Sequence, residues 1–317
     1  LRREIESLGG EVRFDTPLTG LLTRGGTLCG VRTPAGEIAA DTLVLAVGHS
    51  ARDTFALLRD AGLPLEAKPF SVGFRAEHLQ SEIDRALYHE AAGHPALPPG
   101  EYQLSAQVGG RGVYTFCMCP GGQVVAAASE AGGLVTNGMS FHARDGANAN
   151  AAVVVGVGPE DFGGDPFAAI AFQRRLEQAA FAAGGADYTA PAQDMRHFLA
   201  AAPGLTLGRV QPSYPRGVVG ADLGALLPAE LAGALRAGLS AFGRRLPGYC
   251  ADDAVLTGLE TRTSSPLRIP RDERGVCTGL PGLYPCGEGA GYAGGIVSAA
   301  VDGLRAARSV LEEYAYQ

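Results

Sequence analysis

"GLYPCGEGAGYAGGIVSAAVDGLRAA", residues 282–307, is the stretch from which the fold is best interpreted. Gly289, Gly291 and Gly294 have the spacing G-x-G-x-x-G, which is typical of a dinucleotide-binding turn between a strand and a helix. Such a turn normally opens a βαβ unit, but only 23 residues follow Gly294, too few for a helix, a returning strand and the rest of a sheet. We therefore expect a strand, a glycine turn and a closing helix.

Three interpretations of this turn are open. As an NAD fingerprint it would take Glu312 or Glu313 as the acidic ribose ligand, but these residues lie in the expected helix rather than at the end of a second strand. The glycines could instead only allow the helix to pack closely on a sheet. In the third interpretation Glu288 ends a strand and offers a carboxylate to sugar or ribityl hydroxyls, beside the positive end of a helix dipole, which suits a flavin.

Length and composition restrict the classes of partner that we expect for this protein. The 317 residues suffice for two ordinary domains. The net charge is −7 and the basic residues are scattered, so we expect no nucleic-acid partner. The longest apolar runs fall short of the roughly 18 residues that a membrane span needs, and no signal segment opens the chain. These features predict a soluble, cytoplasmic protein with no membrane partner.

The cysteines predict neither a metal site nor a disulfide framework. The six of them are spread along the chain without a C-x-x-C pair or a histidine cluster, so we expect no metal ligands and reduced thiols. The sequence also starts at Leu1, within a helix-like stretch, and we interpret it as a fragment whose natural N-terminus is missing.

Local patterns predict short strands first and helices later. Residues 1–8 indicate the end of an amphipathic helix, and strands are expected at 11–15, 18–24, 28–33 and 37–47, the last buried on both faces over residues 43–47. Asp165, Pro166 and Gly184 begin and end a predicted helix. Two further helices are expected at 228–246 and from Ile296 to about Tyr314.

Long blocks of the chain carry a family resemblance. "RGVYTFCMCPGGQVVAAASEAGGLVTNGMSFHARDGANANAAVVVGV" (111–157), "GLETRTSSPLRIPRDERG" (258–275) and the C-terminal stretch resemble a bacterial FAD-dependent dehydrogenase family of the glutathione-reductase-like superfamily. The resemblance implies an α/β fold: a partial, Rossmann-like FAD-binding domain, without its first βαβ and G-x-G-x-x-G turn, and an inserted α+β substrate or cap domain. We expect FAD-binding parts at 1–67 and 256–317 and the inserted domain at 68–255.

The same resemblance implies FAD as the cofactor and assigns its contacts. The predicted contacts lie near the adenine, the dinucleotide, the ribityl and pyrophosphate groups and the isoalloxazine: Val12, Ala46, Val47, Gly48, Gly287, Glu288, Gly289, Gly294, Gly295 and Ile296. A helix N-terminus near the N1 and C2 carbonyl edge would stabilise the charge of a reduced flavin. His49 is a further candidate on the dinucleotide side.

Cys117 and Cys119 are candidates for redox chemistry. On a regular strand both side chains would point to the same face, where they could form a redox pair, line a pocket near the flavin, or be ordinary strand thiols. These three interpretations stay open.

Two polar segments supply candidates for catalysis and substrate binding. The loop around residues 137–148 contains Asn137 and Ser140 as pocket candidates and His142 as a candidate acid or base, although the loop could also be a solvated surface turn. Arg262 could hold an anionic substrate or pair with Glu260, and Thr263 and Ser264 are pocket candidates beside it.

We therefore predict an FAD-dependent oxidoreductase, a dehydrogenase, that transfers a hydride between a small organic substrate and flavin N5. NAD(P)H or another electron donor or acceptor is a further candidate partner, and the oligomeric state stays open. The alternatives are a non-catalytic flavin-binding or interaction module, a fragment unable to bind FAD, and a flavin disulfide reductase that uses Cys117 and Cys119.

Overall fold

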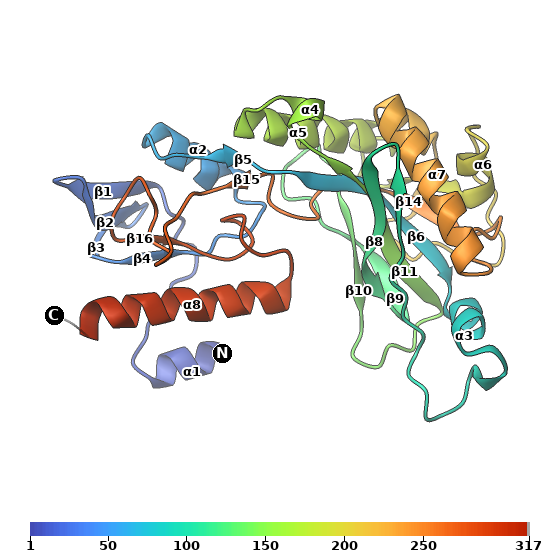
Figure 1. Cartoon of the computed structure of the whole chain (residues 1–317), viewed down its shortest axis with the longest axis horizontal. Helices are drawn as coiled ribbons and strands as arrows, with labels where there is room; N and C mark the ends of the chain where they lie inside the picture. The colour runs from blue at the N-terminus through green and yellow to red at the C-terminus, as the bar shows by residue number, and fades with distance from the viewer. Residues whose placement is uncertain (316–317) are drawn as a thin grey trace. The chain divides into compact units, whose positions relative to one another are not determined.

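The computed structural model describes residues 1–315 and divides into two compact units (Figure 1). The smaller unit comprises Leu1–Glu66 and the segment from Ser264 onward, and the larger unit comprises Ala67–Thr263. We describe each unit by itself. In residues 1–315, no helix has the length and apolar character that crossing a membrane requires.

A mixed seven-stranded sheet forms the larger unit (Figure 1). Neighbouring strands are antiparallel except for β12 and β13, which are parallel. In spatial order the strands are β13 (Val218–Gly220), β12 (Ala190–Asp194), β14 (Val255–Glu260), β6 (Phe70–Leu79), β11 (Asn148–Val157), β8 (Arg111–Cys119) and β7 (Ser105–Val108).

The two central strands show why the sheet has two unlike faces. β6 and β11 pair over their whole length, from Phe70 opposite Val157 to Leu79 opposite Asn148. Because side chains alternate along a strand, Val72, Phe74 and Ala76 enter the hydrophobic core, whereas Arg75 and Glu77 project to the opposite face. One face is thus apolar and the other carries buried charge.

Helices cover the apolar face and fill its core. α5 and α7 lie along this face (Figure 1). Their side chains Phe172, Leu235 and Phe242 are buried in the same cluster as Phe74. The helical segments of the larger unit are α3 (Gln80–Tyr88), η1 (His89–Ala91), α4 (Pro159–Phe162), α5 (Pro166–Ala183), α6 (Met195–Leu199), η2 (Leu223–Leu226) and α7 (Ala229–Arg245).

Local signals predicted the long helices correctly. The Asp165 carboxylate accepts hydrogen bonds from the backbone N–H groups of Phe167 and Ala168 at the start of α5, and Gly184 follows its last residue. α7 and the terminal helix α8 (Ile296–Ala315) also occupy the predicted segments. The structure therefore confirms these predictions. The local sequence suffices to predict these helices, because capping and stop signals act within a few residues.

The hairpin of β9 (Gly122–Ala126) and β10 (Thr136–Ser140) contacts the strands that carry the charged face. The Asn137 side chain of β10 accepts a hydrogen bond from Arg75 of β6. Ser213, in the segment between α6 and β13, donates to Glu77 on the same face. The buried charges are thereby enclosed rather than left on an open surface.

The smaller unit contains less regular structure (Figure 1). β1 (Gly20–Arg24), β2 (Thr27–Thr33) and β3 (Gly36–Ala39) form an antiparallel sheet, and β4 (Leu43–Leu45) pairs in parallel with β16 (Leu283–Pro285). Its helices are α1 (Arg2–Ser7), α2 (Arg52–Asp60) and α8, and the short strands β5 (Glu66–Ala67) and β15 (Leu267–Arg268) lie near the unit boundaries.

Two strand predictions in this unit are wrong. Residues 11–15 form no strand, because no described strand pairs with them to accept their backbone hydrogen bonds. The predicted strand at 37–47 is divided into β3 and β4, and Val44 is 44% exposed, so residues 43–47 are not buried on both faces.

The chain returns to the smaller unit after Thr263, whereas the sequence suggested residue 255. Residues 255–260 form β14, whose neighbours are β6 and β12 of the larger unit. Strand pairing between distant segments, rather than the local pattern, decides to which unit this segment belongs.

Candidate functional site

The first candidate site lies in the smaller unit, where two parallel strands end together. Leu45 of β4 is opposite Pro285 of β16, so the turns that follow, 46–50 and 286–289, leave the same edge. The close approach requires glycine at position 289, because a Cβ there would lie 2.4 Å from the Gly48 carbonyl oxygen. Gly289, the first glycine of the G-x-G-x-x-G spacing, is thus the point where the backbones of the two turns come into contact.

A carboxylate and an imidazole meet at this edge. Glu288 Oε1 lies 2.9 Å from His49 Nδ1, and both side chains are about a quarter exposed. The two residues come from the two turns, so each is positioned by a different strand. This pair offers a hydrogen-bond acceptor to ligand hydroxyl groups beside a titratable ring.

A buried carboxylate of α8 supports the second turn. Asp302 Oδ2 accepts a 2.7 Å hydrogen bond from the Gly287 backbone N–H, and both of its oxygens accept from Arg271. Burial alone would raise the pKa of Asp302, but the guanidinium of Arg271 and the N–H of Gly287 hold it below its ordinary value. Asp302 therefore stays ionised and positions Gly287.

The start of α8 is accessible. Gly294 and Gly295 precede Ile296, the first residue of the helix, and a Cβ at either glycine would have no neighbour within 4 Å. Neither glycine has a positive φ. The first N–H groups of a helix lack intrahelical acceptors, so this end can donate hydrogen bonds to an electron-rich ligand edge.

An open hollow of about 640 Å³ lies beside β4. Val31, Ile38 and the 43–47 segment form its apolar wall, and Glu11 and Arg13 contribute charged groups. The predicted cofactor contacts Ala46 and Val47 belong to this lining, whereas Val12 lines a separate hollow with residues of α1.

The second candidate site is the charged face in the larger unit, with Arg75 at its centre. Arg75 is fully buried, and its Nε and Nη2 donate to Glu260 at 2.5 and 2.9 Å. Its remaining donors reach the Cys117 carbonyl oxygen, Asn150 and Asn137. The guanidinium therefore links four separate segments through charge-assisted hydrogen bonds.

The predicted pocket residues are largely engaged in contacts within the protein. Asn137 accepts from Arg75, Ser140 Oγ donates to the Pro120 carbonyl oxygen, and Thr263 bonds to the backbone of Ser71. Ser264 is half-buried and begins the second segment of the smaller unit.

The two catalytic candidates outside the cysteines lie in different environments. Arg262 is buried and donates through Nε and Nη2 to Glu177 of α5, each at 3.0 Å, whereas Glu260 is bonded to Arg75. His142 is exposed in the loop after β10. Asn137 and Glu260 meet at Arg75, whereas Arg262 is bonded to Glu177. The roles of the candidate residues in catalysis or substrate binding stay predictions.

Sequence reasoning missed the buried partners Arg75, Glu77 and Glu177. A signal was present for the first two, because "FSVGFRAEHL" (70–79) alternates apolar residues with Ser71, Arg75 and Glu77. Burial raises the pKa of Glu77, against hydrogen bonds from Ser213 and Asn148 that favour its charged form. The side chains that bond to these groups, such as Glu260 to Arg75 and Ser213 to Glu77, come from distant segments, so no local pattern identifies them.

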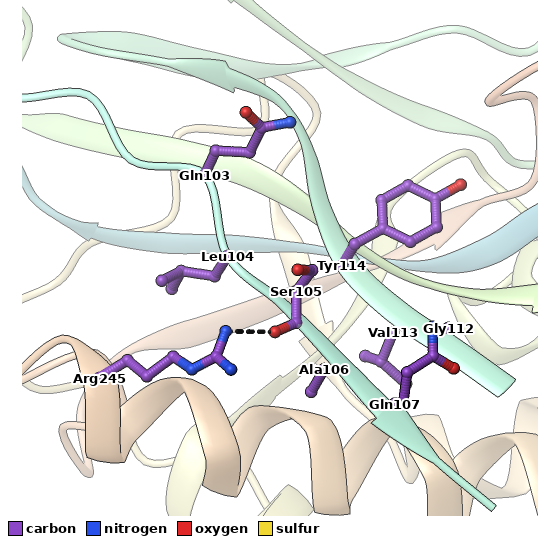
Figure 2. A pocket seen from close by; sticks show the side chains of 9 residues that line it. All are labelled: Gln103, Leu104, Ser105, Ala106, Gln107, Gly112, Val113, Tyr114 and Arg245. Carbon is purple, nitrogen blue, oxygen red and sulfur yellow. Dashed lines mark hydrogen bonds between the residues drawn. The ribbon is translucent and has the colours of Figure 1, made fainter. Parts of the chain in front are cut away.

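A further hollow lies along the edge strand β7 (Figure 2). Arg245 of α7 reaches across to β7 and donates to the Ser105 carbonyl oxygen at 2.5 Å. The other lining groups are mostly apolar or uncharged, including Leu104, Val113 and Tyr114. Within residues 1–315, no cluster of three or more side chains suited to a metal ion occurs.

Comparison with known proteins identifies the family. Residues 69–263 match the model of the FAD-dependent protein, C-terminal domain-like family. The chain belongs to this family. The matched segment coincides almost entirely with the larger unit, and the match supports FAD as the cofactor of this FAD-dependent family member.

A relative from Clostridium beijerinckii, described as an uncharacterized protein, is 46% identical over 317 residues. The match covers 99% of this chain and 60% of the relative, so the chain spans about three fifths of the relative's length.

Two solved structures also resemble this chain weakly. They are CtdE in complex with FAD, and CtdE in complex with FAD and substrate 4, each 11% identical to this chain. The alignments cover 98% of this chain and 57% and 53% of those chains, with TM-scores of 0.35 and 0.32.

The residues of the smaller unit fit an FAD-type ligand at the edge described above. A carboxylate suits hydroxyl groups, an uncrowded helix N-terminus suits the electron-rich edge of a ring, and an apolar wall suits an aromatic base. The groups come from Glu288, the start of α8 and the hollow beside β4.

Proposed function

We propose that this chain is part of an FAD-dependent oxidoreductase that transfers a hydride between a small organic substrate and flavin N5. The observation that carries the proposal is the meeting of the 46–50 and 286–289 turns next to the accessible N-terminus of α8. The family match supports the cofactor. The proposal assigns the cofactor contacts to the smaller unit and interprets this unit as a partial Rossmann-like domain.

Each group in the smaller unit has a task in this proposal. A bound flavin would accept a hydride at N5, and negative charge would then develop along its N1 and O2 edge. The first N–H groups of α8, at Gly295 and Ile296, stabilise that charge together with the helix dipole. Glu288 accepts hydrogen bonds from ribityl hydroxyls, and His49 orients its carboxylate. Ala46 and Val47 contact the dinucleotide from the wall of the hollow.

The larger unit, in this proposal, is the inserted domain that supplies the substrate-binding groups. Its enclosed charges on β6 and β14 hold the sheet face in one arrangement, because each buried cation has a carboxylate partner. Asn137 bonds to Arg75, and Thr263 bonds to the backbone of Ser71. In this proposal the buried ion pairs therefore also fix the positions of these two substrate-pocket candidates.

FAD titration of the purified chain tests the proposal. We expect the protein to bind FAD, and we expect Gly295→Val to weaken binding about tenfold or more by filling the space at the start of α8. Thermal stability should stay unchanged, because a side chain at position 295 meets no neighbouring atom.

Gly303→Val is the matched control. Gly303 lies in the middle of α8, and a Cβ there also has no neighbour within 4 Å. This variant should bind FAD as the unchanged protein does. Equal weakening by both variants would contradict the placement of the flavin at the helix N-terminus. A chain that binds no FAD would favour a non-catalytic interaction module or a fragment unable to bind FAD.

A further inference from the structure

Cys117 and Cys119 lie at an irregularity of β8. Cys119 is opposite Asn150 of β11 and Phe116 is opposite Ala152, so three residue steps on β8 match two on β11. Cys117 has a φ of +46° within this bulge. An extra residue in one strand bends it and re-aims side chains, which departs from the regular alternation expected from the sequence.

The bulge gives the two thiols different surroundings. Cys117 is exposed and Cys119 is buried. The Cys119 thiol lies 3.3 Å from the Cys117 carbonyl oxygen, and Arg75 Nη1 donates to the same oxygen at 2.8 Å. One sulfur is accessible to reagents, while the other is held directly beside its partner's backbone.

The electrostatics separate the two thiols further. The side-chain interaction with Cys119 lowers the pKa of Cys117 to about 6, and the Arg75 guanidinium acts in the same direction against the effect of burial. The pKa of Cys119 is raised by its side-chain interaction with Cys117 and by desolvation. At neutral pH one accessible thiolate therefore lies beside one protonated thiol.

We propose that Cys117 and Cys119 form a reversible thiol pair that reacts with hydroperoxides, in which Cys117 attacks and Cys119 resolves the product. The Cys117 thiolate attacks the terminal peroxide oxygen, the O–O bond breaks, and Cys117 becomes a sulfenic acid while an alkoxide or hydroxide leaves and takes a proton. The Cys119 thiol then displaces water and forms the Cys117–Cys119 disulfide. Two thiols lose two electrons, and the peroxide is reduced to an alcohol, or water, plus water.

This activity is separate from the proposed flavin chemistry. All the groups that support it, Cys117, Cys119 and Arg75, belong to the larger unit. A loss of FAD binding would leave it intact, and a loss of the thiol pair would leave FAD binding intact.

The first experiment measures labelling of the intact chain by iodoacetamide between pH 5 and 9, with each cysteine followed by peptide mass spectrometry. Cys117 should label with a midpoint below pH 7, whereas an ordinary thiol titrates near pH ~8.5. Cys119→Ser keeps a hydroxyl donor and should keep this low midpoint. Cys119→Ala removes the donor and should move the midpoint upward by about one pH unit or more. A Cys117 midpoint at or above pH 8 would overturn the proposal.

The second experiment treats the chain with hydrogen peroxide at pH 7. The unchanged protein should lose two hydrogens between Cys117 and Cys119 and recover them with dithiothreitol. Cys119→Ser should instead accumulate a sulfenic acid at Cys117 that dimedone traps, and Cys117→Ser should form neither product. Overoxidation of Cys117 in the unchanged protein at the rate seen in Cys119→Ser, or disulfides only between chains, would exclude Cys119 as the resolving thiol.

Discussion

The long helices α7 and α8 show how differently the two units use apolar residues. α7 buries seven of its 17 residues, including Leu231, Leu235 and Phe242, against the sheet of the larger unit. α8 has 20 residues and buries only Asp302 and Ala306, while Ile296 and Leu304 are 92% and 72% exposed. The core of the larger unit therefore includes a long helix, whereas α8 adds little to the buried apolar side chains of the smaller unit, such as Phe55 and Leu283.

Individual charge pairs also differ in burial, although the smaller unit has a buried pair of its own, Arg271 with Asp302. Arg75 and Glu260 are enclosed on the sheet face, whereas Arg308 and Glu312 on α8 form an exposed pair. A buried charge that loses its partner costs far more free energy than an exposed one, because water cannot replace the lost contacts.

Removing one charge from each pair gives the largest expected effect. Glu260→Gln should lower the free energy of unfolding by about 3–5 kcal/mol, since it leaves Arg75 buried without its carboxylate. Glu312→Gln, the matched exposed change, should cost less than about 0.5 kcal/mol. Urea denaturation followed by circular dichroism measures both. A similar cost for the two variants would mean that solvent reaches the Arg75 pair.

The pH dependence of the larger unit gives the next largest effect. Burial lowers the pKa of His78 to about 4 in the folded chain, while an unfolded imidazole takes up a proton near pH ~6.5. Between these values the unfolded state binds more protons, so the contribution of His78 to stability falls as the pH is lowered from 6.5 to 4. The full change is on the order of 3 kcal/mol.

Comparing the chain with His78→Gln separates this contribution from the carboxylates, Glu77 in particular. The stability difference between the two proteins should change across pH 4–6.5 and stay constant above pH 7. A difference that is the same at every pH would show that His78 takes up its proton in the folded state as readily as in the unfolded one.

Replacing exposed apolar side chains on α8 gives the smallest expected effect. Leu304→Ser should change the free energy of unfolding by less than about 0.5 kcal/mol, because the side chain lies mostly in water. Leu235→Ala, on the buried face of α7, should lower the free energy of unfolding by about 2–5 kcal/mol. If Leu304→Ser destabilised the protein by more than about 2 kcal/mol, α8 would be covered in solution by another surface, and the contrast between the helices would be removed.

The sequence predicted most reliably what depends on neighbours along the chain. Asp165, Pro166 and Gly184 delimit α5 by capping and helix termination, and the run after Gly295 forms the terminal helix as expected. The turn at 286–289 follows a strand, also as predicted. The segment 11–15 has a strand-like pattern but no partner, because pairing is not encoded locally.

The two candidate sites differ in the same way, in whether neighbouring or distant residues define them. The candidate flavin contacts near Glu288 could be named from a motif and a resemblance, and their binding role stays a prediction. Arg75 could not be named, because its function in the fold requires Glu260, Asn137 and Cys117 to approach from three other segments. The lowered pKa of Cys117 has the same origin.

By itself, the sequence determined the long helices, the glycine turn before α8 and a family resemblance that the match over residues 69–263 supports. Tertiary structure alone decided that β14 belongs to the larger unit, that Glu260 neutralises Arg75, and that a bulge separates Cys117 from Cys119. The physical reason is range. Capping and turn preferences act over a few residues, whereas strand pairing and charge neutralisation join residues more than 100 positions apart, such as Arg75 and Glu260.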